Sequence, residues 1–379
     1  MGYRYVLTAD RSQLSNYRDN YLFGFLSCGP AKISPEPIYS MICPTKDTYD
    51  SRTGELVLAP VGLRRIQGSL ERAGWVGKVV AQHPFMLDKA INEKTRVVGL
   101  TEMSPLGIGP VDTAISWKND SWNRKWFVSL MKHLMELKKK LRFKVVVGGP
   151  GAWQLLHPFT DYLRNQGTPI GNMAAAFRRT VGPSSNREAV VDEWVKEELG
   201  VDHVVEGEAD SAAPEIFEKI EGGDAPEYIR VFTNYIRSVD DIPKITRPTL
   251  TGSVEIMRGC GRGCDFCAPN LRTKRDFPIE RIVREAGVNI RMGHRAVWLL
   301  TEELTLYGCD NRNTVPNEDA IIKLYTALKR DCQLKAVHAF IHLSVVFILY
   351  VGKYMLNCLI LLFSLENHCS IGFLIPNVS

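Results

Sequence analysis

Three cysteines within eight residues are the part of this sequence whose chemistry can be recognised directly. Cys260, Cys264 and Cys267 follow an apolar run, residues 253–257, that predicts a strand. Glycines at alternate positions from 259 to 263 let the backbone turn tightly, so the three sulfurs can face one point. Three soft thiolates on one loop are typical ligands of zinc or of an iron–sulfur cluster.

The number of thiols favours an iron–sulfur cluster over zinc. A structural zinc site takes four protein ligands, commonly as two close pairs. The next cysteine, Cys309, lies far along the chain and has no close partner in the sequence. Three thiolates fit a four-iron cluster that leaves one iron open to a further ligand. A structural or redox-active cysteine cluster of another kind is the alternative.

The spacing of the cysteines, with an aromatic residue just before the third, resembles the cluster loop of the radical S-adenosylmethionine (SAM) family. The resemblance implies that Cys260, Cys264 and Cys267 each bind one iron of a [4Fe–4S] cluster, and that the fourth iron chelates SAM. It implies that Phe266 lies near the adenine or shields the cluster. One electron from the cluster would then cleave SAM into methionine and a 5′-deoxyadenosyl radical.

Two glutamates are further candidates for SAM binding. Glu302 and Glu303 stand at the carboxyl end of a strand predicted over residues 296–301. In the radical SAM family, a segment at this point holds the amino group of SAM, so the resemblance implies that one of the two glutamates takes that role. The alternative is that both are solvated acids of a loop.

The composition is that of an ordinary globular protein. Of the 379 residues, 45% are hydrophobic and 23% charged, which suits two domains with sizeable cores. The net charge of +5 is mild and gives no specific nucleic-acid signal. Nine cysteines, three of them in one loop, favour a reducing compartment, and the N-terminus lacks the layout of a signal peptide. We therefore expect a cytoplasmic protein.

The first 240 residues alternate between predicted strands and helices, which indicates βαβ units on a parallel sheet. The predicted strands cover residues 3–8, 78–81, 96–101, 144–147 and 201–205. Residues 11–58 are too rich in tyrosine and phenylalanine to be disordered and predict an ordered lid. Ligands of such sheets bind at the carboxyl ends of the strands. Those ends carry the binding candidates Thr101, Ser104, Gly148, Gly149, Gly207 and Glu208.

The order of these segments resembles the radical SAM enzymes that carry a cobalamin-binding domain. A strand ending at Gly-Leu-Thr101, a Gly148-Gly-Pro-Gly151 loop and a Glu206-Gly-Glu208 turn all precede the cysteine loop. The resemblance covers roughly residues 1–335. It implies an α/β protein with a Rossmann-like doubly wound parallel sheet that binds cobalamin over residues 1–240. A partial radical SAM (β/α) barrel follows over residues 250–339.

One motif of many cobalamin proteins is missing. The sequence has no Asp-x-His-x-x-Gly cobalt-ligand motif, and His83 has no aspartate two residues before it. Cobalamin would therefore be held without a histidine from that motif.

The function implied by the resemblance is radical methylation of an unactivated carbon, with cobalamin as the methyl carrier. The substrate would be a small molecule or a protein, and the electron donor a ferredoxin or flavodoxin. The alternatives are radical rearrangement or cyclisation without methyl transfer, or an inactive remnant that still binds an iron–sulfur cluster or cobalamin.

The last forty residues, 340–379, form an atypical apolar tail. From residue 336 to the end only Lys353 and Glu366 are charged. Too few residues remain to complete a barrel of about six βα units. We expect a coding sequence interrupted near residue 340, with a truncated or frame-shifted end. A membrane segment, which would place Lys353 in mid-bilayer, and a divergent barrel end are the alternatives.

Overall fold

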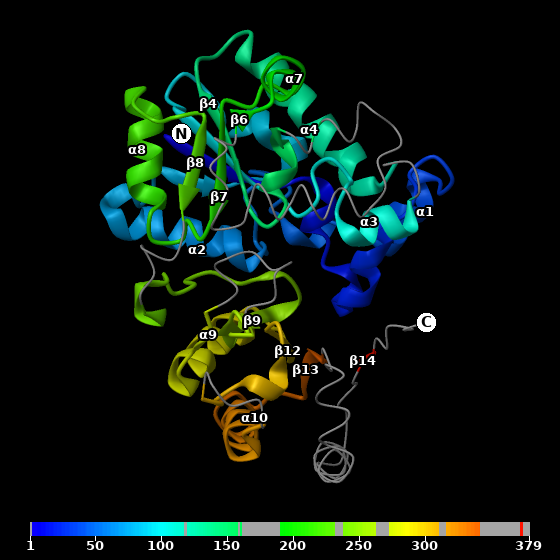
Figure 1. The fold of residues 1–379 in the computed structure, drawn as a ribbon, viewed down its shortest axis with the longest axis vertical. Coiled ribbons are helices and arrows are strands. Elements are labelled where there is room, and N and C mark those ends of the chain that lie inside the picture. The colour runs from blue at the N-terminus through cyan, green and yellow to red at the C-terminus, as the bar shows by residue number, and fades with distance from the viewer. Residues whose placement is uncertain are drawn as a thin grey trace. The chain divides into compact units, whose positions relative to one another are not determined.

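The chain forms two compact units, Met1–Leu250 and Thr251–Ser379 (Figure 1). The computed structural model describes residues 2–116, 120–157, 160, 190–231, 238–262, 273–310, 316–341 and 372–373. Each unit is built on a parallel sheet.

The sheet of the first unit has six parallel strands in the order β2-β1-β3-β4-β7-β8. Their bounds are β1 Tyr5–Thr8, β2 Val79–Ala81, β3 Val97–Thr101, β4 Lys144–Gly148, β7 His203–Gly207 and β8 Tyr228–Val231. Strand β2 lies on one side of β1 and β3 lies on the other, and the later strands continue on the β3 side. The strand order therefore reverses between β1 and β3. Open sheets of this kind bind their ligands at such a switch point.

Helices cover both faces of this sheet (Figure 1). One face carries α4 (Trp122–Lys138) and α7 (Glu193–Leu199), and the other α2 (Val61–Leu70) and α8 (Ala213–Gly222). Successive side chains of a strand point to opposite faces, so each strand contributes to both hydrophobic cores. The predicted α/β fold with a doubly wound parallel sheet is confirmed.

One strand of this sheet was not expected from the sequence. Strand β8 lies at the sheet edge beside β7, and three of its four side chains are only partly buried. Because such a strand lacks a strong apolar run, the pattern of residues 228–231 gave no clear signal.

The lid expected between residues 11 and 58 is ordered. It contains a short 3-10 helix, Tyr21–Cys28, and α1, Glu36–Ile42. Its aromatic side chains pack against α4, where Tyr39 stacks on Trp122 with ring centroids 4.4 Å apart.

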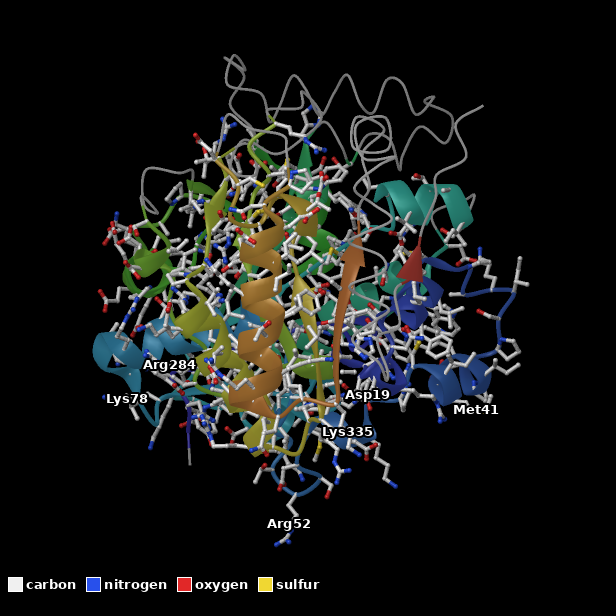
Figure 2. All side chains as sticks on the ribbon, turned by 90° about the horizontal axis from the view of Figure 1, so that it is seen from below. Asp19, Met41, Arg52, Lys78, Arg284 and Lys335 are labelled. Carbon is white, nitrogen blue, oxygen red and sulfur yellow. The ribbon has the colours of Figure 1, made fainter. Side chains whose placement is uncertain are left out.

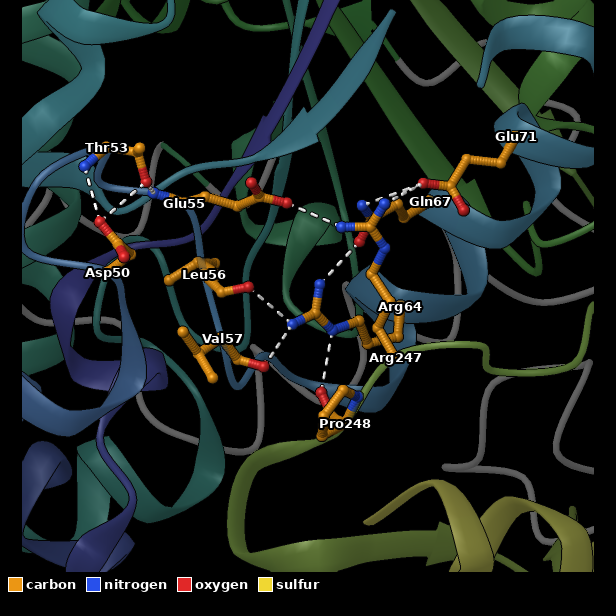
Figure 3. Close-up of polar contacts among 10 residues, drawn as sticks. All are labelled: Asp50, Thr53, Glu55, Leu56, Val57, Arg64, Gln67, Glu71, Arg247 and Pro248. Atoms are coloured by element: carbon orange, nitrogen blue, oxygen red, sulfur yellow. Dashed lines mark hydrogen bonds and ion pairs between the residues drawn. The ribbon is translucent and has the colours of Figure 1, made fainter. Parts of the chain in front are cut away.

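A buried arginine forms hydrogen bonds that hold the last residues of the first unit against the rest of that unit. The guanidinium of Arg64, on α2, donates from Nε to Pro248 O (2.9 Å) and from Nη1 to Gln67 Oε1 (2.7 Å). Its Nη2 donates to the carbonyls of Leu56 and Val57, each at 2.9 Å. Figure 3 shows these bonds converging on one side chain. Residues 248–250 therefore belong to the packed structure of the first unit.

A second arginine extends this network. Arg247 donates to Glu55 Oε1 (2.7 Å) and to Glu71 Oε1 (3.0 Å) (Figure 3). Burial and the neighbouring charge of Arg247 lower the pKa of Arg64 to about 10, so Arg64 stays charged at neutral pH.

The second unit is a smaller parallel sheet in the order β14-β13-β12-β9. Its strands are β9 Ser253–Glu255, β12 Ala296–Leu300, β13 Ala336–Ile341 and β14 Gly372–Phe373. Helices α9 (Ile279–Arg291) and α10 (Glu318–Cys332) pack on each other and against β9 and β13.

The first strand of the second unit is shorter than expected. The strand predicted over residues 253–257 is divided, because β9 ends at Glu255 and Met257–Arg258 form β10. Strand β10 pairs antiparallel with β11, Arg275–Asp276.

Most of the apolar tail lies outside the described residues, apart from the end of β13 and the two residues of β14. Within the described ranges, no helix is both long and apolar enough to cross a membrane.

Candidate functional site

Three of the predicted binding residues end neighbouring strands of the first unit. Thr101 and Gly148 are register partners at the ends of β3 and β4, and Gly207 ends β7. Gly149 follows with φ +96°, and a Cβ there would lie 2.6 Å from the backbone nitrogen of Glu102. The glycine is required because the loop passes directly over that backbone.

The structure also places the other two candidates of this edge. Ser104 is buried, and its hydroxyl accepts from the backbone N–H of Gly109 (3.2 Å) and from Gln154 Nε2 (3.1 Å), which fixes the loop after β3. Glu208 is buried in the loop that follows β7. Ligand contact by either residue stays a prediction.

A cavity of about 80 Å³ lies between the sheet and helices α2 and α8. Its lining is mostly apolar and includes Leu7, Ile66, Gly99, Ile216 and Phe217. The predicted residues Thr101, Gly148, Gly149 and Gly207 also line it. Because its wall is apolar, the cavity favours a hydrocarbon or aromatic group over water.

Two buried carboxyl groups at the switch point were not predicted as a pair. Glu102 Oε1 accepts from the backbone N–H of Asp10 at 3.1 Å. The side-chain amide of Gln13 donates to both Glu102 Oε2 (2.6 Å) and Asp10 Oδ2 (2.9 Å). Burial, and then the charge of Asp10, raise the pKa of Glu102 well above its usual range. Glu102 therefore keeps its proton to a higher pH than an exposed glutamate would.

This edge fits cobalamin held without a histidine ligand. The residues that line its cavity include no histidine, and His83 is fully buried and stacks on Tyr49 with ring centroids 4.1 Å apart. The loop after β1 carries Asp10-Arg-Ser12 and offers no imidazole.

Only part of the cysteine loop falls within the described residues. Cys260 is a free, half-buried thiol two residues beyond β10, whereas Cys264, Phe266 and Cys267 lie outside the described ranges. Gly259 and Gly261, on either side of Cys260, have φ of +72° and +78°. No group of three potential metal ligands occurs among the described side chains, which include one of the three predicted thiols.

Glu303 forms an ion pair with an arginine of the cysteine loop. Arg262, two residues after Cys260, approaches Glu303 with Nη1 2.6 Å from Oε2 and Nη2 3.0 Å from Oε1. The hydroxyl of Thr305 also donates to Oε1 (2.8 Å). This buried carboxylate holds the loop in place and has little capacity left for a ligand.

Glu302 differs from Glu303 in the hydrogen bonding of its carboxylate. It is half-buried, and its Oε2 is buried without a hydrogen-bond partner in the described part of the chain. Burial raises the pKa of Glu302. A buried oxygen without a donor is costly unless a ligand supplies one, and an ammonium group is a suitable donor. Of the two predicted glutamates, Glu302 fits the amino group of SAM better.

Comparison with known proteins gives local sequence matches to methylthiotransferases. No protein-family model matches the chain. The ribosomal protein uS12 methylthiotransferase RimO of Porphyromonas gingivalis is 32% identical over 79 residues, 20% of this chain and 18% of that protein. The tRNA-2-methylthio-N(6)-dimethylallyladenosine synthase of Fusobacterium nucleatum is 27% identical over 128 residues, 32% of this chain and 28% of that protein. Both relatives are radical SAM enzymes.

The chain is thus a relative of the radical SAM enzymes. It spans less than a third of the length of these curated relatives. Among solved structures, the radical SAM methyltransferase TsrM of Kitasatospora setae, with cobalamin and a [4Fe–4S] cluster bound, gives a TM-score of 0.47 at 13% identity. That match covers 89% of this chain and 59% of TsrM. The cobalamin-dependent radical enzyme OxsB gives a TM-score of 0.35 at 10% identity, over 90% of this chain and 44% of OxsB.

Proposed function

We propose that this radical SAM relative transfers a methyl group, carried by cobalamin, to an unactivated carbon of a small-molecule or protein substrate. The observation that carries the proposal is the apolar, glycine-lined cavity beside the switch point of the six-stranded sheet. A sheet that only supported a barrel would not need a cavity at its ligand-binding edge.

The cofactor roles follow from the donor groups of the second unit. Thiolates of Cys260, Cys264 and Cys267 would hold a [4Fe–4S] cluster, and Glu302 would accept a hydrogen bond from the amino group of SAM. The bound cofactors would supply the 5′-deoxyadenosyl radical and the methyl group, with electrons from a ferredoxin or flavodoxin. The ion pair of Arg262 with Glu303 would keep Cys260 in position.

In the first unit, the chain would hold and orient cobalamin. Thr101, Gly148, Gly149 and Gly207 line the cavity that would take an apolar part of the molecule. Gly149 brings the loop against the backbone of Glu102, where a larger residue would push it away.

Methylthio transfer is a second candidate, favoured by the sequence matches to RimO and to the tRNA methylthio synthase. The two reactions differ in their products. Methyl transfer adds a methyl group alone, whereas methylthio transfer also adds a sulfur atom.

Anaerobic reconstitution tests the proposal. Reconstituted protein should bind about four irons per chain and, with a strong reductant, convert SAM to 5′-deoxyadenosine. Addition of cobalamin should then give S-adenosylhomocysteine as the carrier is remethylated. If 5′-deoxyadenosine forms but cobalamin neither binds nor changes the products, methyl transfer is wrong and another radical reaction applies. If the cluster forms without any cleavage of SAM, radical SAM activity itself is wrong.

The cysteine assignment has a direct test. Cys264→Ala should abolish the visible absorbance of the reconstituted cluster, because two thiolates do not hold four irons. Cys309→Ala is the matched control, since the Cys309 thiol is buried, lies 3.5 Å from Thr305 O and has its pKa raised by burial. Unchanged absorbance in Cys264→Ala would contradict the assignment.

A further inference from the structure

We propose that Arg11 and His83 form a binding site for a small oxyanion, a carboxylate or phosphate, at the carboxyl ends of β1 and β2. The site goes beyond the proposed function and does not depend on it. The oxyanion is a free ion or the charged end of a larger ligand.

Arg11 is a buried cation without a carboxylate partner among the described residues. Its side chain follows β1, is 7% exposed, and lies between two rings, with Cζ 4.7 Å from the centroid of Trp126 and 5.3 Å from that of Tyr39. Nη2 donates to Ser40 Oγ at 2.9 Å. Nη1 is buried and has no hydrogen-bond partner among the described residues.

The nearest acid in the sequence does not neutralise this cation. Asp10 precedes Arg11, but its carboxylate accepts from the backbone N–H of Ser12 (2.6 Å) and from Gln13 Nε2 (2.9 Å). No carboxylate lies within ion-pair distance of Arg11 in the described ranges. An unpaired buried charge is costly, and contacts with two aromatic faces offset only part of that cost.

His83 supplies a second donor without an acceptor. The ring is fully buried and its Nδ1 accepts from the backbone N–H of Phe85 at 3.3 Å. Burial, and then the charge of Arg11, lower the pKa of His83 to about 3, so the ring is neutral. With Nδ1 accepting, the proton is on Nε2, which is buried and without a partner in the described residues.

Arg11 and His83 belong to one aromatic cluster, because the ring centroid of Phe85 lies 5.1 Å from that of His83 and 5.7 Å from that of Trp126, over which Arg11 lies. The charge of Arg11 also acts on His83, and the two groups without partners can only donate. A ligand that serves both must therefore be an acceptor, and one that balances Arg11 must be an anion. A carboxylate or phosphate satisfies both conditions, whereas a water molecule would leave the charge of Arg11 uncompensated. The rings of Tyr39, Trp126 and Tyr49 around these groups favour a small ligand.

The wild-type full-length chain provides the first test. Protein labelled with ¹⁵N-histidine is titrated with inorganic phosphate and, separately, with acetate, at constant ionic strength maintained with sodium chloride. The proposal expects a saturable shift of the His83 Nε2 resonance with at least one anion, with the signal assigned by its loss in His83→Phe. A response no larger than that to sodium chloride alone, for both anions, would overturn the proposal.

Variants locate the effect on Arg11. Arg11→Met should weaken binding of the anion about tenfold or more, the size of one charged hydrogen bond. Arg18→Met is the matched control, because Arg18 lies on the same lid but is exposed and donates to Met41 O. Equal affinity in Arg11→Met and wild type would overturn the site. If Arg11→Met does not fold, the titration of the wild type with phosphate and acetate, compared with sodium chloride alone, still tests the proposal.

Discussion

Two of the buried arginines of the first unit, Arg64 and Arg11, have surroundings that differ sharply. Arg64 is 2% exposed and donates to three backbone carbonyls and one side-chain amide (Figure 3). Arg11 is nearly as buried but makes one described hydrogen bond and leaves Nη1 unpaired. The difference shows that burial of an arginine does not by itself mark a site. Whether each N–H donor of the guanidinium has an acceptor distinguishes an arginine that stabilises the fold from one that can bind a ligand.

The largest expected effect comes from removing the satisfied arginine. Arg64→Met would leave the carbonyls of Leu56, Val57 and Pro248 buried without donors, so the free energy of unfolding should fall by about 3 kcal/mol or more in urea denaturation. Arg52→Met is the control, because Arg52 extends away from the fold in Figure 2, and should change stability by about 0.5 kcal/mol at most.

Removal of the unsatisfied arginine should cost less. Arg11→Met loses the bond to Ser40 and two ring contacts but also removes an uncompensated buried charge. Without added anion, we expect a loss of about 1 kcal/mol in urea denaturation. A loss equal to that of Arg64→Met would remove the distinction between the two arginines.

The effect of Glu102→Gln should depend on pH, because this buried carboxyl group lies against the loop that carries Arg11. The raised pKa of Glu102 means that the folded protein keeps a proton that the unfolded chain releases above its ordinary pKa of 4.5. The folded state therefore binds more protons, and this contribution to stability falls as the pH rises above that value. An amide does not titrate, so the variant should gain on the wild type as the pH rises above about 4.5 in urea denaturation. A difference independent of pH would show that Glu102 is ionised.

Much of the first unit could be predicted because strand and helix periods are local in the sequence. The apolar runs at 96–101 and 144–147 became β3 and β4, and the predicted binding glycines Gly148 and Gly149 stand at the end of β4. Strand β8 was missed because it is a partly exposed edge strand, and β9 and β10 were merged because nothing local marks their different partners.

The candidate site was harder to predict, because its decisive features depend on contacts between distant residues. Glu302 and Glu303 are adjacent, yet Arg262 pairs with Glu303, whereas Glu302 Oε2 has no partner among the described residues. The carboxyl pair of Asp10 and Glu102 depends on β1 and β3 being neighbours, which local patterns do not reveal. In the sequence, the pair is indicated by the acidic residue that follows each of these two strands, Asp10 after β1 and Glu102 after β3.

The ion pair of Arg262 with Glu303 has a consequence for metal loading. It joins the segment just after Cys260 to the end of β12 through two nitrogen–oxygen contacts. Arg262 is thereby restricted, so this position would lose little further conformational entropy if the loop bound metal. Iron capture at Cys260 should consequently proceed as a local ligation step rather than as coupled folding of the segment.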